Sequence, residues 1–321
     1  MNDRLQANQA LEVGKALLSP NGQTMFDFQG DGNLVLTVMR AGARVARWSS
    51  RTNGKNASRC ILQGDGNLVI YGKDDKALWA SNTAVHVGGD LARLVVQDDE
   101  NVVLTRQNQT AWSTNTWMSA PIHVGFDASR YGFRFANTFD SVPYKVGTVT
   151  LHSSGACGGM SYASLDYFHA NRAAPATPAQ PPTNEALAEY IFRRQQDSLL
   201  GSWHGSKFVA LIMNPDDHAL WYWSTHDEWT ALQHALASGP IPLGLIKRYL
   251  DFADAHQVIA TGCQTGSRER RIFIHDPNHP EREHELLQLA GNLHWLHTAG
   301  GGEADWRGLF VETGYTAVAP P

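Results

Sequence analysis

The sequence predicts a protein of two domains, an all-β domain over residues 1–117 followed by an α+β domain over residues 118–321. Two observations support this prediction. Strand-like segments repeat along the first third of the chain, and a mixture of helix-like and strand-like segments follows them. A length of 321 residues is sufficient for about two domains. Hydrophobic residues make up 42% of the chain and charged residues 18%, which is enough apolar material for two cores.

The charge of the chain and its N-terminus exclude several classes of partner. The net charge is −5 and contains no block of like charges, which argues against nucleic acid or an anionic membrane as the main partner. No run of about 18 apolar residues is present, so the sequence predicts no transmembrane segment. The first residues lack the apolar core of a signal peptide. We therefore expect synthesis in the cytoplasm, with export only by a route that needs no such signal.

The cysteines and histidines do not form a metal-binding or disulfide pattern. Cys60, Cys157 and Cys263 cannot all pair, and none of them has Cys-x-x-Cys spacing. The 14 histidines include no convincing metal-ligand pair. The sequence also has no glycine-rich phosphate loop and no dinucleotide fingerprint. We therefore expect neither a metal nor a cofactor.

A nine-residue segment occurs three times at a constant interval. The copies begin at Gln29, Gln63 and Gln97, and each later reaches a tryptophan, namely Trp48, Trp79 and Trp112. Within each copy polar and apolar residues alternate, β-branched residues are frequent, and Asp-Gly or Asn-Gly turns interrupt the repeats, which is typical of strands. Helical repeats of similar length do not alternate in this way. The pattern predicts a pseudo-threefold β-prism with the indoles stacked on its axis.

The alternation also places the polar residues of each copy on one face of a strand. In the second copy these residues are Gln63, Asp65, Asn67, Val69 and Tyr71. A carboxylate, two amides and a phenol can bind the hydroxyl groups of a sugar, and the valine adds an apolar contact. The alternative is that the aspartate and asparagine only form turns. The same register in three copies favours the sugar site.

The pattern Gln-x-Asp-x-Asn-x-Val-x-Tyr resembles that of the bulb-type mannose-binding lectins, over roughly residues 1 to 117. The resemblance implies a β-prism that binds mannose-type glycans without a metal. The first and third copies end in Thr37 and Thr105 where the family has tyrosine, so weaker sites are expected there, formed by Gln29, Asp31, Asn33, Gln97, Asp99 and Asn101. Useful avidity then needs several sites, or an oligomer formed through this module. We expect Cys60 to lie in the core.

The second domain is organised around residues 153–168, where a lead of small residues reaches Cys157 and a helical pattern follows. Met160, Ala163 and Tyr167 fall on one stripe of the predicted amphipathic helix. Cys157 then lies at the first helical turn, where free N–H groups and the helix dipole favour a thiolate. We expect the neighbouring glycines to leave room for a substrate carbonyl. The alternative is a small, buried structural cysteine.

Two strand-like segments near the C-terminus carry the partners that this cysteine needs. His256 begins an apolar strand and Asp276 ends the next one, and the residues between them, 263–269, predict a hairpin. In that hairpin both side chains lie at the same end. Asp276 would hold one ring nitrogen while the other faces Cys157, as a general base and acid requires. Asn278 competes with Asp276 for the role of orienting the imidazole.

The remaining segments predict the helices and strands around these residues. We expect helices over 185–200 and from the capping box Thr225-x-x-Glu228 to Ala237, strands over 207–213, 243–249, 256–262, 271–275 and 283–289, a proline-rich loop over 173–184, and an early strand or a loop over 126–139. Cys263 is an odd number of residues after His256, so we expect its side chain on the opposite face of the strand.

With these residues in place, the second domain resembles the papain-like cysteine peptidases over roughly residues 122 to 318. The segments 155–160, 256–258 and 276–278 carry the resemblance. It implies that Cys157 is the nucleophile, His256 the general base and acid, and Asp276 the orienting residue. Papain relatives place a glutamine shortly before the cysteine as an oxyanion donor, but residues 149–156 contain none. The backbone N–H of Cys157 and the side chain of Asn137 are the candidate donors.

The sequence therefore predicts a mannose-binding lectin module that brings a cysteine peptidase to a glycan-bearing surface or partner. The substrate would be a peptide or a protein. A transglutaminase or glutamine deamidase that uses the same three residues is a second candidate. A carbohydrate-binding protein whose second domain is inactive is the third.

Overall fold

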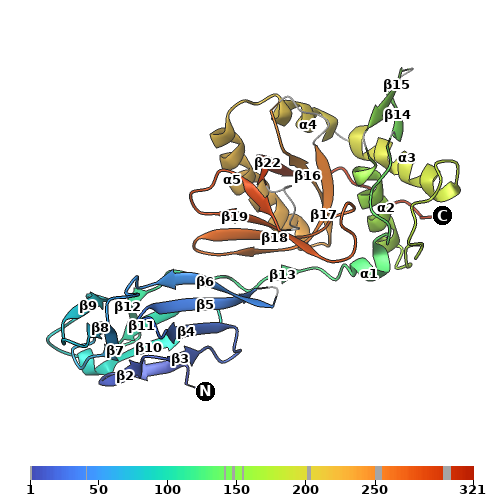
Figure 1. Cartoon of the computed structure of the whole chain (residues 1–321). Helices are drawn as coiled ribbons and strands as arrows, with labels where there is room; N and C mark the ends of the chain where they lie inside the picture. Colours follow the sequence, from blue (N-terminus) through green and yellow to red (C-terminus); the bar gives the residue numbers. More distant parts are fainter. Residues whose placement is uncertain are drawn as a thin grey trace. The chain divides into compact units, whose positions relative to one another are not determined.

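The structure, a computed structural model, describes residues 2–40, 42–140, 142–146, 149–153, 155–200, 204–249, 255–298 and 305–321. The chain divides into two compact units. The first comprises Met1–Ala120 with Gly266–Arg268, and the second comprises Pro121–Thr265 with Glu269–Pro321. Figure 1 labels their helices and strands. None of the helices in the described ranges is both long and apolar enough to cross a membrane.

The described part of the first unit contains three antiparallel sheets of four strands each (Figure 1). One sheet contains β3 (Lys15–Leu18), β4 (Thr24–Phe28), β5 (Leu34–Arg40) and β6 (Ala43–Ser49). The next contains β2 (Gln9–Glu12), β7 (Ala57–Leu62), β8 (Leu68–Gly72) and β9 (Ala77–Ala80). The last contains β1 (Arg4–Gln6), β10 (Ala92–Val96), β11 (Val102–Arg106) and β12 (Gln109–Ser113), and the short helix η1 (Gly89–Leu91) precedes β10. The predicted all-β fold with one sheet per repeat is confirmed.

The three sheets of this unit share one apolar core, in which the repeated tryptophans meet. The ring centroids of Trp48, Trp79 and Trp112 lie 5.4 to 5.5 Å apart. Their planes are inclined by 71° to 79°, so the indoles pack edge to face and the expected stacking is wrong. Edge-to-face packing sets the positive edge of one ring against the negative face of the next. Cys60 lies fully buried in this core, as expected.

The N-terminal segment completes each of the three sheets in turn. β1 pairs with β10, β2 with β7 and β3 with β4, all in antiparallel register. The repeat in the sequence did not predict these strands, because the repeated segments begin only at Gln29 and the pairings are non-local. The N-terminal segment therefore ties the three repeats into one unit.

The second unit contains a mixed arrangement of helices and one large antiparallel sheet. In the described residues this sheet has eight strands, in the order β21-β20-β19-β18-β17-β16-β22, with β13 also paired to β17. The strands are β13 (Ile122–His123), β16 (Ile241–Ile246), β17 (His256–Thr265), β18 (Glu269–His275), β19 (His284–Leu289), β20 (Trp295–His297), β21 (Asp305–Trp306) and β22 (Gly308–Val311). A separate hairpin joins β14 (Val142–Val146) to β15 (Val149–Ser153).

The helices of the second unit come before most of its sheet in the sequence (Figure 1). They are α1 (Ala128–Tyr131), α2 (Cys157–His169), α3 (Ala186–Leu200), α4 (His204–Ile212) and α5 (Asp217–Leu236). The helix expected over 185–200 is confirmed as α3, and the strands expected near 243–249, 256–262, 271–275 and 283–289 are confirmed as β16 to β19. The segment 126–139 forms α1 and loops, and the segment 173–184 is a loop.

The strand expected over 207–213 is wrong, because this segment continues helix α4. Phe208 and Ile212 are one helical turn apart and pack with Ile246 and Phe310 in a small apolar cluster. A strand would have sent these two side chains to the same face as well. The short apolar run was therefore ambiguous between the two structures.

The start expected for the next helix is also wrong. Helix α5 begins at Asp217, after Asp216, whose carboxylate accepts hydrogen bonds from the N–H groups of His218 and Ala219. Thr225 lies inside the helix, and its hydroxyl donates to the carbonyl of Trp221 at 2.6 Å. The aspartate is the true N-cap, and the Thr225-x-x-Glu228 spacing is a chance match to a capping box.

Helix α2 begins at Cys157, as expected, but it is not amphipathic. Every residue from Cys157 to Tyr167 is buried, because α3 packs against one side of the helix and strands β16 and β17 against another. A helix that is buried all round belongs in the centre of a unit. Ser154, which precedes it in the predicted segment, lies outside the described residues.

Candidate functional site

The N-terminus of α2 places Cys157 in a polar setting. The Cys157 side chain is 9% exposed and lies in the first helical turn. Side chains from two other segments accept hydrogen bonds from backbone N–H groups on either side of Cys157. Asn137 Oδ1 accepts the N–H of Ala156 at 2.7 Å, and Gln195 Oε1 on α3 accepts the N–H of Gly159 at 2.7 Å. These bonds fix the first turn, so that the positive end of the helix dipole acts on the sulfur.

The predicted hairpin brings His256 and Asp276 together. Strands β17 and β18 are antiparallel, with Ile259 opposite His275, so the start of β17 lies beside the end of β18. The imidazole Nε2 lies 2.8 Å from Asp276 Oδ1, and both side chains are buried. The strands run further than expected, and the connection shortens to residues 266–268.

The electrostatics of this pair favour a charged imidazole. Burial opposes the charge, but the carboxylate of Asp276 and hydrogen bonds to Asp276 and Cys157 raise the pKa of His256 well above its ordinary value. Burial likewise disfavours the carboxylate, but His256 and the N–H of Asn278 hold the pKa of Asp276 far below its usual range. Since Asp276 engages Nε2, the ring's Nδ1 is the nitrogen available to the thiol. The three side chains expected to meet do meet.

Asn137 and Asn278 hold neighbouring segments of this site together. The Nδ2 group of Asn137 donates to Asn278 Oδ1 at 3.0 Å, and the backbone N–H of Asn137 donates to the carbonyl of Pro277 at 2.9 Å. Asn137 therefore joins the residue before Cys157 to the segment after Asp276. The amide of Asn137 has two Nδ2 hydrogens. The bond to Asn278 uses one of them, so the other can donate elsewhere. Among the hydrogen bonds of the described residues, Asp276 and not Asn278 holds the imidazole.

The glycines after Cys157 serve packing and do not open a path to the sulfur. A Cβ atom on Gly158 would lie 1.8 Å from Gln257 Oε1, and one on Gly159 would lie 2.2 Å from the carbonyl oxygen of Ile191. Neither distance leaves room for a side chain. The expected role of these glycines in substrate access is therefore wrong, because they let α2 approach β17 and α3 closely.

The other cysteine of the second unit has no part in this site. Cys263 is 1% exposed and lies in the core beneath the sheet, away from the cluster that contains α2. Burial raises the pKa of its thiol to about 11. Within the described ranges, no group of three or more histidine, cysteine, aspartate or glutamate residues could hold a metal ion.

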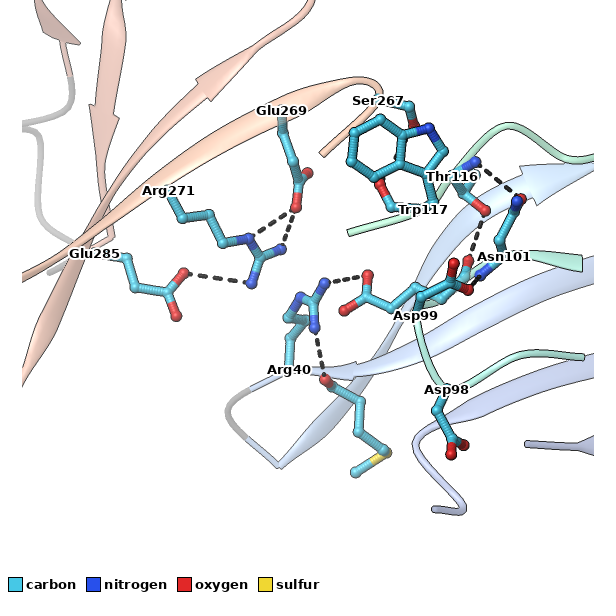
Figure 2. Close-up of polar contacts among 12 residues, drawn as sticks. Arg40, Asp98, Asp99, Asn101, Thr116, Trp117, Ser267, Glu269, Arg271 and Glu285 are labelled. Atoms are coloured by element: carbon cyan, nitrogen blue, oxygen red, sulfur yellow. Dashed lines mark hydrogen bonds and ion pairs between the residues drawn. The ribbon is translucent and has the colours of Figure 1, made fainter. Parts of the chain in front are cut away.

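The three repeats of the first unit build the same polar turn. In the second repeat Asp65 Oδ1 accepts the N–H of Asn67 at 2.9 Å, and Asn67 Oδ1 accepts from Ser81 Oγ and the N–H of Thr83. Asp31 and Asn33 make the corresponding bonds in the first repeat. Figure 2 shows the third copy, in which Asn101 Oδ1 accepts from the N–H of Thr116 at 3.2 Å. The turn uses one oxygen of each side chain and leaves the Asn Nδ2 group as a donor.

Only the second repeat adds a phenol to this arrangement. Gln63 Nε2 donates to the hydroxyl of Tyr71 at 3.0 Å, which orients that hydroxyl. Val69 is buried beside it, Asp65 is exposed, and Asn67 is half-buried. The guanidinium carbon of Arg59 lies 4.9 Å from the centre of the Tyr71 ring. The expectation that all five residues project from one face of a strand is wrong. Val69 and Tyr71 lie in β8, but Gln63, Asp65 and Asn67 lie in the turn between β7 and β8, where Asp65 and Asn67 hold the turn by hydrogen bonds.

The first and third repeats differ in their chemistry at the corresponding positions. In the first, Gln29 hydrogen-bonds to Asp27, and burial raises the pKa of that carboxyl. In the third, Asn101 is buried and Arg40 pairs with Glu100 next to it in the sequence (Figure 2). Gln29 is therefore bonded to a neighbouring side chain, and Asn101 is less exposed than Asn67 of the second repeat.

Comparison with known proteins finds solved structures that are similar to the first unit. No protein-family model and no curated protein matches this chain. Among solved structures, a monomeric monocot mannose-binding lectin from Gastrodia elata is 40% identical, covering 36% of this chain and 99% of its own, with a TM-score of 0.32. The mannose-specific agglutinin from snowdrop (Galanthus nivalis) bulbs, in complex with methyl-α-D-mannoside, is 32% identical over 35% of this chain and 95% of its own, with a TM-score of 0.29. The Marasmius oreades lectin is 31% identical over 36% and 92%, with a TM-score of 0.31.

Over its N-terminal third, the chain is similar to bulb-type mannose-binding lectins. The first unit is called the lectin unit after this similarity. The lectin unit also explains the short N-terminal strands β1 to β3, since each completes one of its sheets.

Sequence reasoning missed several residues that support the second unit's site. Gln195 and Gln257 are buried and make hydrogen bonds next to Cys157 and His256 respectively. Gln257 gave a signal that could have been used, because it is a polar residue between His256 and the apolar run Val258–Ala260. Gln195 lies in the polar part of a helix pattern and gave none.

Proposed function

We propose that the second unit is a papain-like cysteine hydrolase that acts on peptide bonds, and that the lectin unit binds mannose-type glycans. Through that binding, the lectin unit would bring the hydrolase to a glycan-bearing surface or partner. The observation that supports the hydrolase is the contact of His256 with both Asp276 and Cys157, with the cysteine at a helix N-terminus. A cysteine, a base and a group that orients the base are the parts that nucleophilic catalysis by a thiol needs.

The proposed reaction is acyl transfer from a peptide to water. The Cys157 thiolate attacks the amide carbonyl, and the N–H of Cys157, with the remaining Nδ2 hydrogen of Asn137, binds the oxyanion that forms. The imidazolium of His256 gives its Nδ1 proton to the departing amine, which leaves a thioester on Cys157. Neutral His256 then takes a proton from water as the water attacks the thioester, and the acid product leaves. Asp276 holds the ring in place throughout.

The experiment for the hydrolase measures the products formed from a peptide mixture that contains glutamine. Wild-type protein is compared with Cys157→Ala and with Cys263→Ala, which removes the other thiol of the same unit. We expect new peptide N-termini with the wild type and with Cys263→Ala, and none with Cys157→Ala. Equal cleavage by Cys157→Ala would contradict the proposal. Ammonia release without cleavage would instead identify a deamidase that uses the same thioester.

The proposed glycan site is the second repeat of the lectin unit. Two of the matched lectins are named for mannose binding, and this repeat alone joins the shared turn to a tyrosine hydroxyl held by Gln63. Asp65 supplies an acceptor, Asn67 a donor, and Tyr71 a hydroxyl that both donates and accepts. Val69 lies next to them as an apolar contact. A set of this kind suits the hydroxyl groups of a mannose ring.

A further inference from the structure

The side chain of Gln257 lies at the centre of a buried polar network in the second unit. Gln257 is 2% exposed and directly follows His256 in β17. Its Nε2 group donates to Glu312 Oε1 at 2.6 Å, and its Oε1 accepts from Ser198 Oγ on α3 at 3.1 Å. The hydroxyl of Ser161 on α2 donates to the backbone carbonyl of Gln257 at 3.3 Å. One residue thus connects α2, α3, β17 and the segment after β22.

The same amide also lies against the first turn of α2. Gly158 has no side chain, and a Cβ there would lie 1.8 Å from Gln257 Oε1 and 2.2 Å from Ser198 Oγ. Gln257 therefore touches the residue that follows Cys157 and is itself the residue that follows His256. Its position determines how closely α2 approaches β17 at the point where the sulfur and the imidazole meet.

Glu312 anchors the far side of this network. It is fully buried, and burial raises the pKa of its carboxyl to about 7. The groups that face it are the amide of Gln257, the hydroxyl of Tyr162 on α2 and the charge of Lys207 on α4. The carboxyl can accept from Gln257 in either protonation state, so the anchor persists when it is neutral.

We propose that Gln257, held by Glu312 and Ser198, is a positioning residue that keeps the Cys157 sulfur in contact with the His256 imidazole. This inference rests on the proposed thiol chemistry and extends it to a residue that touches neither the substrate nor the sulfur. Hydrogen bonds among buried polar side chains fix one arrangement of the surrounding elements. Loss of the network lets α2 and β17 move apart, and the thiol then loses the partner that makes it a thiolate.

The test is the pH profile of Cys157 alkylation by iodoacetamide, with the modified cysteine identified by mass spectrometry in the full-length protein. Gln257→Leu removes both hydrogen bonds at similar volume. Gln288→Leu is the matched control, since Gln288 is a buried glutamine on β19 whose side chain, within the described residues, donates to the carbonyls of Leu289 and Asn292. We expect Gln257→Leu to slow alkylation at about pH 6 by about tenfold, because the sulfur loses its contact with the charged imidazole of His256. We expect Gln288→Leu to lower the melting temperature without moving the profile.

Two further variants complete the design. Glu312→Gln keeps an oxygen that accepts from Gln257, so its profile should match the wild type. Glu312→Leu removes that oxygen and should reproduce the effect of Gln257→Leu, which keeps the proposal testable if Gln257→Leu does not fold. A Gln257→Leu profile equal to the wild type, or an equal shift in Gln288→Leu, overturns the positioning role alone. A wild-type thiol with the reactivity of an ordinary cysteine at about pH 6 overturns the proposed function as well.

Discussion

In the proposed chemistry, two interactions of different size act on the sulfur of Cys157. A charge at a helix N-terminus gains about 0.3 to 1 kcal/mol at an exposed site. A hydrogen bond to a charged partner contributes about 1.5 to 3 kcal/mol. The imidazolium of His256 is therefore the larger effect, and it depends on Asp276, which lies 2.8 Å from the ring. The reactivity of the cysteine should follow the charge of the histidine more closely than the geometry of the helix.

Asp276→Asn tests this ranking at the residue scale. The asparagine keeps the shape of the side chain but loses the charge that raises the pKa of His256. We expect the alkylation rate of Cys157 at about pH 6 to fall at least about tenfold, since the imidazolium that stabilises the thiolate is lost. The measurement is the rate of iodoacetamide labelling as a function of pH. A profile that coincides with that of the wild type would show that the reactivity of Cys157 does not depend on the charge of His256.

The same substitution should change stability in a defined pH window. The pKa of Asp276 is lowered from 3.8, so its contribution is present above that value and is lost as the pH falls. The pKa of His256 is raised above 6.5, so its contribution is present below 6.5 and is lost as the pH rises through the raised value. The melting temperature of Asp276→Asn should therefore fall most between about pH 4 and 6.5. An equal loss at every pH would indicate a packing defect instead.

Glu312→Gln should stabilise the protein at alkaline pH. The pKa of Glu312 is raised from 4.5 to about 7, so the folded state holds a proton that the unfolded state has released between these values. Stability therefore falls as the pH rises through this window, and the loss approaches about 3 kcal/mol above pH 7. The glutamine has no proton to lose. Denaturant unfolding of both proteins should give equal stability near pH 4.5 and a growing advantage for the variant above it; a constant difference would contradict this account.

At the scale of helices and strands, local pattern predicted the elements whose signals are local. The hairpin of β17 and β18 and the start of α2 at Cys157 followed from alternation, from spacing and from small residues before a helical pattern. Helix α4 was not predicted, because the apolar residues Phe208, Val209 and Ile212 fit a strand as well as a helix. The burial of α2 on all sides also escaped prediction, since it results from the close approach of α3 and β17 and not from the helix's own sequence.

Gly158→Ala tests how closely these elements approach one another. The new methyl group would lie 1.8 Å from Gln257 Oε1 and 2.2 Å from Ser198 Oγ, so these side chains or α2 itself must shift. We expect a loss of ~2 kcal/mol in the free energy of unfolding, typical of overpacking in a core, together with slower labelling of Cys157. Gly125→Ala is the control, because no atom lies within 4 Å of a Cβ there. Equal stabilities for the two variants would show that the gap at Gly158 is wider than described.

At the scale of the whole molecule, the two units were predicted by different kinds of information. The fold of the lectin unit was predicted from three copies of one segment. This repeat was enough to predict one sheet for each copy and the meeting of the three tryptophans. The site of the second unit joins side chains at positions 157, 256 and 276, and the sequence supplied them only as residue types that suit a thiol mechanism. The part played by Gln195 became visible only once the elements were packed.

The two proposed activities should be separable by mutation. Asp65→Ala with Asn67→Ala removes the turn and the polar contacts of the second repeat, and the corresponding pair Asp31→Ala with Asn33→Ala does the same to the first. We expect only the first double variant to lose retention on immobilised mannose, because only the second repeat has the tyrosine. Labelling of Cys157 should be unchanged in both. Equal loss of retention in the two variants would show that the first repeat also binds.

The most direct test of the central proposal is the covalent reaction of the full-length protein with a peptidyl epoxide, followed by intact mass and peptide mapping. The account predicts a single adduct on Cys157 of the wild type, none on Cys157→Ala, and labelling of His256→Ala slowed at least about tenfold. A wild-type adduct on Cys60 or Cys263 instead, or labelling of Cys157 at the same rate in His256→Ala, would contradict it.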